Sequence, residues 1–146
     1  MLEETENLGP VKARRLARAV ALQSLYEVDV AGHEPGEVTE YHLGQSDLPP
    51  DGAEFTRALV RGVLAEREEI DKFVSLIAPE WPLEQMAPVD RNILRLAIFE
   101  LRYFRETPLK VAINEAVELA KRFGSDSSRR FVNGALGTFA SKYLET

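Results

Sequence analysis

Residues 89–104 read VDRNILRLAIFELRYF, and their composition indicates the fold class. Isoleucine, leucine and phenylalanine are so frequent there that a helix would be apolar around most of its circumference. Such a helix is stable only when other helices cover it. We therefore predict that residues 89–104 form the central and most buried helix of the protein.

The segments on either side also carry apolar residues at helical spacing. Helices are expected over residues 10–31, 51–76 and 108–123 and after the serine-rich stretch 125–128, with a short helical turn near 83–86. Residues 33–52 are rich in proline, glycine and polar residues, so we expect the most mobile loop there, with one short helix near 38–43. No stretch alternates with the period of two that marks a β-strand. The sequence predicts an all-α, single-domain helical bundle.

The composition is that of an ordinary globular protein. The chain has 146 residues, of which 45% are hydrophobic and 29% are charged, and this length fits one domain with a single core. No apolar run approaches the roughly 20 residues that cross a bilayer. The acidic segment 1–7 lacks the layout of a signal peptide, and the chain contains no cysteine. We expect a soluble, cytoplasmic protein without disulfides.

The sequence contains none of the common enzyme motifs. A glycine-rich phosphate loop, His-Glu-x-x-His and Gly-x-Ser-x-Gly are all missing. The two histidines, His33 and His42, fall in the predicted loop, and solvated loop histidines seldom bind a metal. Acidic residues such as Glu68 and Glu69 fall on predicted solvent faces, whereas acid–base catalysis needs carboxylates in apolar surroundings. We expect no catalytic residues, no cofactor and no metal.

A basic segment in the first helix is the best indication of function. The net charge is −6, yet residues 8–26 contain four cations and no acid. Arg14 and Arg15 lie four and three positions before Arg18, so the three share neighbouring parts of one helix surface, which Lys12 extends. Guanidinium groups bind phosphate in bidentate fashion and stack on bases. The segment favours nucleic-acid binding, and a solvated helix face with ion pairs is an equally good interpretation.

A second cationic cluster lies between the last two predicted helices. Lys121 and Arg122 end one helix, where the helix dipole favours cations. Arg129 and Arg130 begin the next helix, where the dipole disfavours them, and Phe131 follows directly. An aromatic ring beside arginines can stack an unpaired base while the cations neutralise its phosphate. The alternative is that Phe131 belongs to the core.

Three stretches resemble the NusB family of transcription antitermination factors. VDRNILRLAIFEL (89–101) and PLKVAINEAVELAKRFGSDSSRRFVNGALG (108–137) are similar to the C-terminal half of that family, and RRLARAVALQSLYEVD (14–29) is similar to its arginine-rich first helix. The similarity extends over almost the whole chain except about 33–52. It implies about seven helices in two packed helical subdomains, about residues 10–78 and 79–146, and no catalysis.

The resemblance also implies partners and binding residues. Members of this family bind the boxA element of ribosomal RNA leader transcripts together with NusE, a small-subunit ribosomal protein, and join an antitermination complex on RNA polymerase. The RNA contacts implied for this chain are Lys12, Arg14, Arg15, Arg18, Tyr26, Arg95, Arg130, Phe131 and Asn133. Leu16 stands where many relatives have another basic residue. Asp90 and Glu100, as acids on the central helix, are expected to contact the basic partner NusE.

Other interpretations remain open at this stage. The chain could be a non-catalytic helical scaffold that binds proteins and carries its arginines as solvated decoration. It could also form a homodimer that hides the basic helix face. A NusB-like domain of a ribosomal RNA cytosine methyltransferase is not expected, because the sequence contains no region that would bind a methyl donor.

Overall fold

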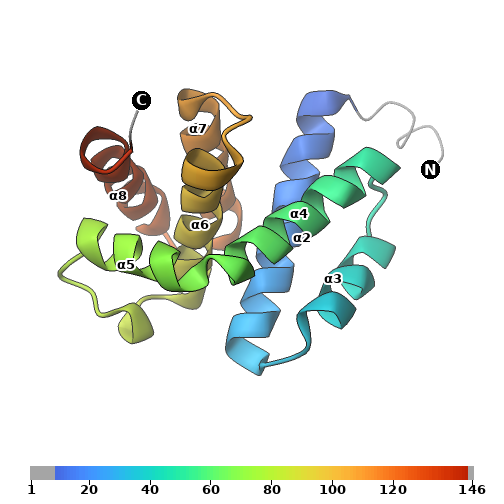
Figure 1. Ribbon diagram of the computed structural model, residues 1–146, viewed down its shortest axis with the longest axis horizontal. Coiled ribbons are helices and arrows are strands. Elements are labelled where there is room, and N and C mark those ends of the chain that lie inside the picture. Colours follow the sequence, from blue (N-terminus) through green and yellow to red (C-terminus); the bar gives the residue numbers. More distant parts are fainter. Residues whose placement is uncertain (1–8, 145–146) are drawn as a thin grey trace. The chain divides into compact units, whose positions relative to one another are not determined.

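A computed structural model describes residues 9–144, and the acidic segment 1–7 lies outside them. Within the described range the chain forms seven α-helices and no β-strand, which confirms the all-α prediction (Figure 1). None of these helices is both long enough and apolar enough to span a bilayer. The chain divides into two compact units, the first ending at Arg61 and the second beginning at Gly62.

The first unit contains α2 (Pro10–Ala31), α3 (Pro35–Gly44) and the first part of α4 (Pro50–Ala65). Pro10 occupies the first turn of α2, where its missing N–H leaves no hydrogen bond unmade. Gly32 ends α2 in the left-handed conformation, with φ of 71°, which glycine adopts without steric cost. The predicted limits of this helix are therefore confirmed.

Small residues on α2 allow α4 to approach it closely. Ala17 is fully buried, and the Thr56 hydroxyl of α4 donates a hydrogen bond to the Ala17 carbonyl oxygen at 3.2 Å. The same hydroxyl lies 3.1 Å from the carbonyl oxygen of Gly52, one helical turn earlier in α4. Phe55, the residue before Thr56, is 5% exposed. This close approach places the Phe55 ring beside the arginines of α2.

Helix α3 occupies much of the segment that was predicted to be a loop. Ten residues are helical, more than the short helix expected near 38–43, and Val38 is buried where α3 packs on α2. The Glu34 side chain caps the helix by accepting hydrogen bonds from the backbone N–H groups of its first turn. Pro35 and Pro50 each begin a helix. The prediction interpreted these prolines as loop signals, although proline is equally suited to a first helical turn.

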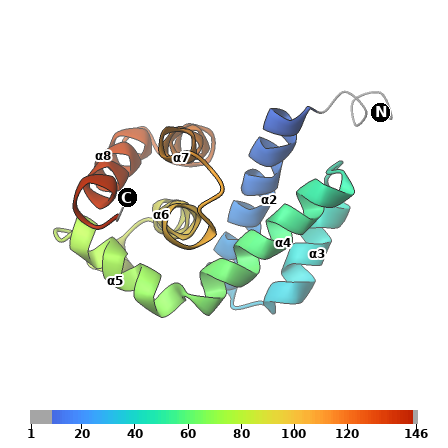
Figure 2. The same ribbon diagram turned by 45° about the horizontal axis from the view of Figure 1, so that its top comes forward.

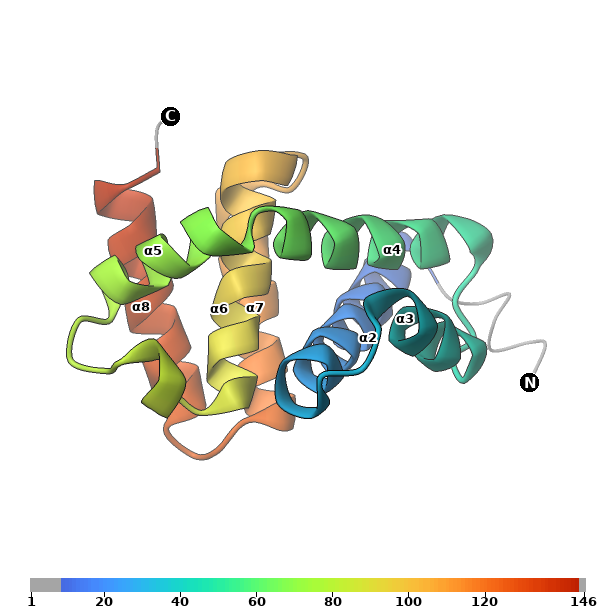
Figure 3. The ribbon, with the colours of Figure 1, turned by 60° about the horizontal axis from the view of Figure 1, so that its bottom comes forward.

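The second unit is built around α6 (Pro88–Phe99). Figures 2 and 3 show the three helices beside it, which are α5 (Arg67–Ile77), α7 (Leu109–Phe123) and α8 (Ser128–Lys142). All three pack on α6, and every residue from Asn92 to Phe99 is buried. The central position predicted for this helix is confirmed within its unit. The chain then continues as one turn of π-helix, Glu100–Phe104, and leaves it through Arg105 in the left-handed conformation.

The single helix predicted over residues 51–76 is in fact two helices. Helix α4 ends at Ala65, a turn follows at Glu66, and α5 begins at Arg67. Helix α5 packs on α6 and α8 within the second unit, which begins inside α4 at Gly62. The apolar spacing is continuous across Glu66, so periodicity alone carried no sign of this turn.

Gly62 lets the end of α4 lie directly against α6. A Cβ atom at this position would come within 2.1 Å of the Phe99 ring. Phe99 is itself 8% exposed and stacks on Tyr103, with ring centres 5.9 Å apart. The absence of a side chain at residue 62 is therefore a packing requirement of the second unit.

Candidate nucleic-acid interface

The basic surface of α2 consists of Lys12, Arg14 and Arg15, all of which are exposed. The Arg14 guanidinium lies over the Phe55 ring, 3.9 Å from its centre, in a cation–π contact. The contact restricts the Arg14 side chain but leaves it in solvent. A restricted cation loses less conformational entropy when it binds a phosphate, so this arrangement favours anion binding.

Arg18 does not belong to this exposed surface, contrary to the prediction from spacing. It is 5% exposed, and its guanidinium lies 5.4 Å from the centre of the same Phe55 ring. Helical spacing correctly placed Arg18 on the same side as Arg14 but could not reveal that α4 covers this part of α2. Tyr26, further along α2, is 39% exposed and remains accessible.

The α8 surface lies in the second unit and consists of Arg129, Arg130, Phe131 and Asn133. The two arginines and the asparagine are exposed, and Phe131 is half-buried. The helix begins at the buried Ser128, whose Oγ accepts a hydrogen bond from the backbone N–H of Ser125 at 2.9 Å. The arginine pair therefore occupies the first turn, where the helix dipole disfavours cations. Their placement needs a reason other than stabilisation of their own helix.

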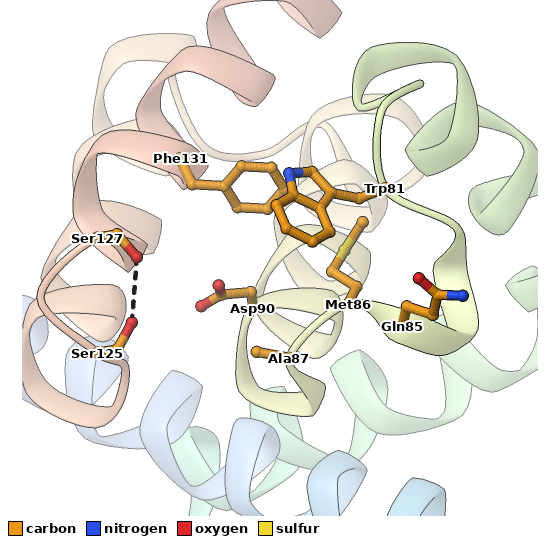
Figure 4. A pocket seen from close by; sticks show the side chains of 8 residues that line it. All are labelled: Trp81, Gln85, Met86, Ala87, Asp90, Ser125, Ser127 and Phe131. Atoms are coloured by element: carbon orange, nitrogen blue, oxygen red, sulfur yellow. Dashed lines mark hydrogen bonds between the residues drawn. The ribbon is translucent and has the colours of Figure 1, made fainter.

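The Phe131 side chain borders a hollow of about 450 Å³ (Figure 4). The residues that line this hollow are Trp81, Gln85, Met86, Ala87, Asp90, Ser125, Ser127 and Phe131. They come from the turn around Trp81, the 3₁₀ helix Leu83–Gln85, the start of α6 and the segment that leads into α8. The Phe131 ring thus faces a space that a ligand can enter, which favours the functional interpretation of this residue over a role in the core.

Asp90 stands at the wall of this hollow, in the first turn of α6. It is 8% exposed, and its Oδ1 atom receives no hydrogen bond from the described residues 9–144. An unsatisfied buried acceptor costs about 1–3 kcal/mol, which the nearby helix N-terminus offsets in part. The sequence predicted a contact between Asp90 and NusE. Its low exposure in this structure leaves little of the Asp90 side chain for such a contact.

Two other predicted contact residues, one on α6 and one in the π-helical turn after it, are buried and engaged within the fold. Arg95 is 4% exposed, and its Nε and Nη2 atoms donate to the two carboxylate oxygens of Asp71 at 2.7 and 3.0 Å. Glu100 is 2% exposed and accepts a hydrogen bond from the Thr107 hydroxyl at 2.8 Å. This burial argues against the RNA contact predicted for Arg95 and the NusE contact predicted for Glu100. The surrounding helices cover both positions, which helical spacing alone could not show.

His33 and His42 share one carboxylate partner. Their ring nitrogens lie 2.8 and 2.9 Å from the two oxygens of Glu27, so this residue connects the last part of α2 to α3 and the turn before it. These hydrogen bonds lower the pKa of Glu27 below its ordinary value. Among the residues that the structure describes, no group of three or more histidines and carboxylates is arranged to hold a metal ion.

Two aromatic residues of these surfaces were not among the predicted site residues. Trp81 is 53% exposed, and the flanking Pro79 and Pro82 were an available sign that it lies on a turn rather than on a buried helix face. Phe55 gave no such sign, because its place in an apolar helical pattern indicates only the core. Its contact with Arg14 depends on how α2 and α4 pack.

Comparisons with known proteins agree with this architecture. Residues 15–141 match the model of the NusB family. The transcription antitermination protein NusB of Roseiflexus sp. (strain RS-1) is 50% identical over 134 residues, which cover 90% of this chain and 94% of that protein. The structure of T. maritima NusB superimposes with a TM-score of 0.84 at 32% identity and covers 90% of this chain and 93% of its own. A chain in a crystal structure of antitermination factors NusB and NusE in complex with dsRNA gives a TM-score of 0.83 at 27% identity, covering 90% and 98%. The chain therefore belongs to the NusB family.

Proposed function

We propose that this chain is a transcription antitermination factor that binds boxA-type, single-stranded RNA of ribosomal transcripts together with NusE. The observation that carries the proposal is the exposed Arg130 beside Phe131, whose ring faces a hollow. This pairing provides base stacking and phosphate neutralisation at one place. Membership of the NusB family supports the proposal, as does the likeness to a NusB structure obtained with NusE and dsRNA.

The two surfaces have different tasks in this proposal. Lys12, Arg14 and Arg15 bind phosphates and supply affinity that falls as salt rises. On α8, Phe131 stacks an unpaired base, while Arg130 neutralises the adjoining phosphate and Asn133 offers an amide for hydrogen bonds. Tyr26 provides a further accessible ring. Arg18 acts indirectly, since it is buried against the same ring that restrains Arg14.

NusE raises the RNA affinity of the complex in this proposal. The chain carries a net charge of −6, so its overall field opposes the approach of RNA. A basic partner reduces this opposition and adds contacts of its own, and the two-protein complex therefore binds RNA more tightly than this chain alone. The complex then acts on RNA polymerase. A homodimer that hides the basic surface of α2 would compete with RNA.

The test measures binding of a fluorescent boxA-type RNA at two salt concentrations, with and without NusE. Wild type is compared with the Arg14→Ala/Arg15→Ala variant and with Phe131→Ala. Loss of two phosphate contacts should reduce the slope of log affinity against log salt by about 1.4, at about 0.7 per contact. Loss of one stacking ring should weaken binding by about 5- to 150-fold with little change in this slope.

The matched control is Arg61→Ala/Arg67→Ala, which removes the same charge from exposed positions outside both surfaces. It should retain most of the affinity and the preference for boxA-type RNA over a scrambled sequence. Binding without any such preference, even with NusE present, would contradict the proposal. A helical scaffold that binds only proteins would then be the better account of the chain.

A further inference from the structure

The acidic segment 1–7, which lies outside the described residues, directly precedes the basic surface of α2 in the sequence. It carries Glu3, Glu4 and Glu6 and no lysine or arginine, so its side chains contribute a charge of −3. Residues 8–26 then carry four cations and no acid. Two runs of opposite charge are thus joined covalently, and opposite charges at short range attract each other.

The first part of α2 offers these acids a surface that binds anions. Lys12, Arg14 and Arg15 are exposed, and the Phe55 ring under Arg14 carries no charge that could neutralise it. The N-cap residue is Gly9, which has no side chain to cap the helix, and no acidic residue lies in the first turn. The backbone N–H groups at the start of a helix and the positive end of its dipole add to the attraction that the cations exert on a carboxylate.

The length of the connection permits contact between the acids and this surface. The described chain begins at Gly9, next to the first turn of α2. Glu3 precedes Gly9 by six residues, and an extended chain spans about 3.3–3.6 Å per residue, so the tether is able to reach about 20 Å. Arg15 lies only about 7.5 Å along the helix from Pro10, at about 1.5 Å per residue. A short tether of this kind gives an effective concentration on the order of millimolar.

We propose that the acidic segment 1–7 is an intramolecular competitor that occupies the basic surface of α2 until RNA displaces it. The inference rests on the proposed RNA-binding function and adds a regulatory contact to it. The glutamate carboxylates take the place of RNA phosphates on the three cations. Exposed ion pairs are individually weak, each worth about fivefold or less in an equilibrium constant, so the segment lowers RNA affinity without blocking the surface.

The competitor also changes how RNA binding depends on salt. A single-stranded RNA releases about 0.7 counterion for each phosphate that a cation binds. A cation that already pairs with a carboxylate has fewer counterions to release, because RNA then exchanges one anion for another. Wild type should therefore show a shallower slope of log affinity against log salt than a variant without the acids. Uniform repulsion by the net charge of −6 predicts instead that removing any three exposed acids has the same effect.

The test measures binding of boxA-type RNA to the full-length protein, without NusE, at several salt concentrations. Glu3→Gln/Glu4→Gln/Glu6→Gln should raise the affinity about three- to tenfold at about 0.1 M salt. The slope of log affinity against log salt should become steeper by up to about 2, at about 0.7 for each cation that is uncovered. The affinity for a scrambled RNA should rise by the same factor, because the acids compete for phosphates and not for bases.

A matched control removes the same charge from exposed positions outside the segment, in the variant Glu37→Gln/Glu68→Gln/Glu106→Gln. Exposed charges farther apart than the Debye length, about 10 Å at 0.1 M salt, are largely screened, so RNA affinity should rise less than about twofold. A double-mutant cycle then locates the contact. In the Arg14→Ala/Arg15→Ala background the three changes in the acidic segment should lose most of their effect, because two of the cations that the acids occupy are gone.

A second measurement detects the contact in the absence of RNA. The chain contains no cysteine, so Leu2→Cys carries a nitroxide label at a single position. The label should broaden the backbone amide NMR signals of residues 11–15. This broadening should decrease in about 1 M salt, where the Debye length is about 3 Å, and when excess RNA is added. In the variant with Glu3→Gln/Glu4→Gln/Glu6→Gln the broadening should be weaker and should not change with salt.

Four results would overturn the inference. If the triple variant and its matched control raise RNA affinity equally, or if the cycle is additive, the acids act only through the net charge. If the broadening in wild type does not change with salt, the segment does not occupy the basic surface of α2, and RNA binding itself still stands. If the triple variant binds NusE more weakly and RNA as wild type does, the segment belongs to the partner. If neither wild type nor the variant binds boxA-type RNA, the proposed function fails and the competition fails with it.

Discussion

Replacing Arg95 with alanine should destabilise the fold rather than remove an RNA contact. The Arg95 guanidinium is buried and donates to both carboxylate oxygens of Asp71, at 2.7 and 3.0 Å, and to the Asn92 side chain at 3.2 Å. Truncation leaves Asp71, whose side chain is 20% exposed, without its closest cation. Arg67 is a second cation near Asp71, with its Nε atom 4.0 Å from Oδ2 and its side chain 49% exposed.

The expected magnitude follows from this environment. Removing one partner of a buried ion pair costs about 3–5 kcal/mol. Asp71 retains some contact with water and with Arg67, so we expect a loss of about 2–4 kcal/mol in the free energy of unfolding. In a chain of this size that loss corresponds to a decrease in Tm of about 5–15 °C. The paired replacement Arg95→Met/Asp71→Leu, which leaves neither charge of the buried pair without its partner, should recover much of the stability.

Urea denaturation followed by circular dichroism measures the stability, and RNA binding is measured at a temperature where the variant is folded. Arg61→Ala is the control, because its side chain is 66% exposed and forms one ion pair with Glu54 at 3.4 Å. Its stability should change by less than about 0.5 kcal/mol. The structural assignment of Arg95 is refuted if Arg95→Ala costs less than about 1 kcal/mol yet lowers RNA affinity tenfold.

Three further predictions concern packing, acidity and the basic surface of α2. Gly62→Ala should lower the free energy of unfolding by about 1–3 kcal/mol in thermal denaturation, because the new methyl group meets the Phe99 ring. Gly134→Ala, where the methyl group enters open space, should raise it by about 0.5–1 kcal/mol, and equal effects of the two changes would contradict this reasoning. The pKa of Glu27 is lowered by its hydrogen bonds with two histidines. The Glu27 carboxylate therefore contributes stability above pH 4.5, and this contribution is lost as pH falls below that value. Identical stability–pH profiles for wild type and Glu27→Gln would exclude this contribution. Phe55→Leu keeps the position apolar but removes the ring under Arg14, so RNA affinity should decrease about two- to fivefold. Unchanged RNA affinity would show that the contact between Arg14 and Phe55 does not assist binding.

The helical class, most helix limits and the family could be predicted from the amino-acid sequence alone. Apolar spacing is a local property, so it identified α6 as a helix that others must cover and located α2, α7 and α8. Charge is also visible without a structure. The run from Lys12 to Arg18 and the pair before Phe131 were therefore found as candidate RNA-binding surfaces, and motif similarity identified the NusB family over nearly the whole chain.

Which of these residues are accessible is evident only in the folded molecule. Helical spacing assigns a residue to a face, but whether that face is covered depends on residues far away in the sequence. Arg18 is covered beside Phe55 of α4, and Arg95 is held by Asp71 of α5, although both were predicted to meet RNA. The hollow next to Phe131 was equally hidden, because Trp81, Asp90 and Phe131 come from three separate segments that meet only when the second unit folds. Burial and proximity are properties of the packed chain, so no local pattern could have supplied them.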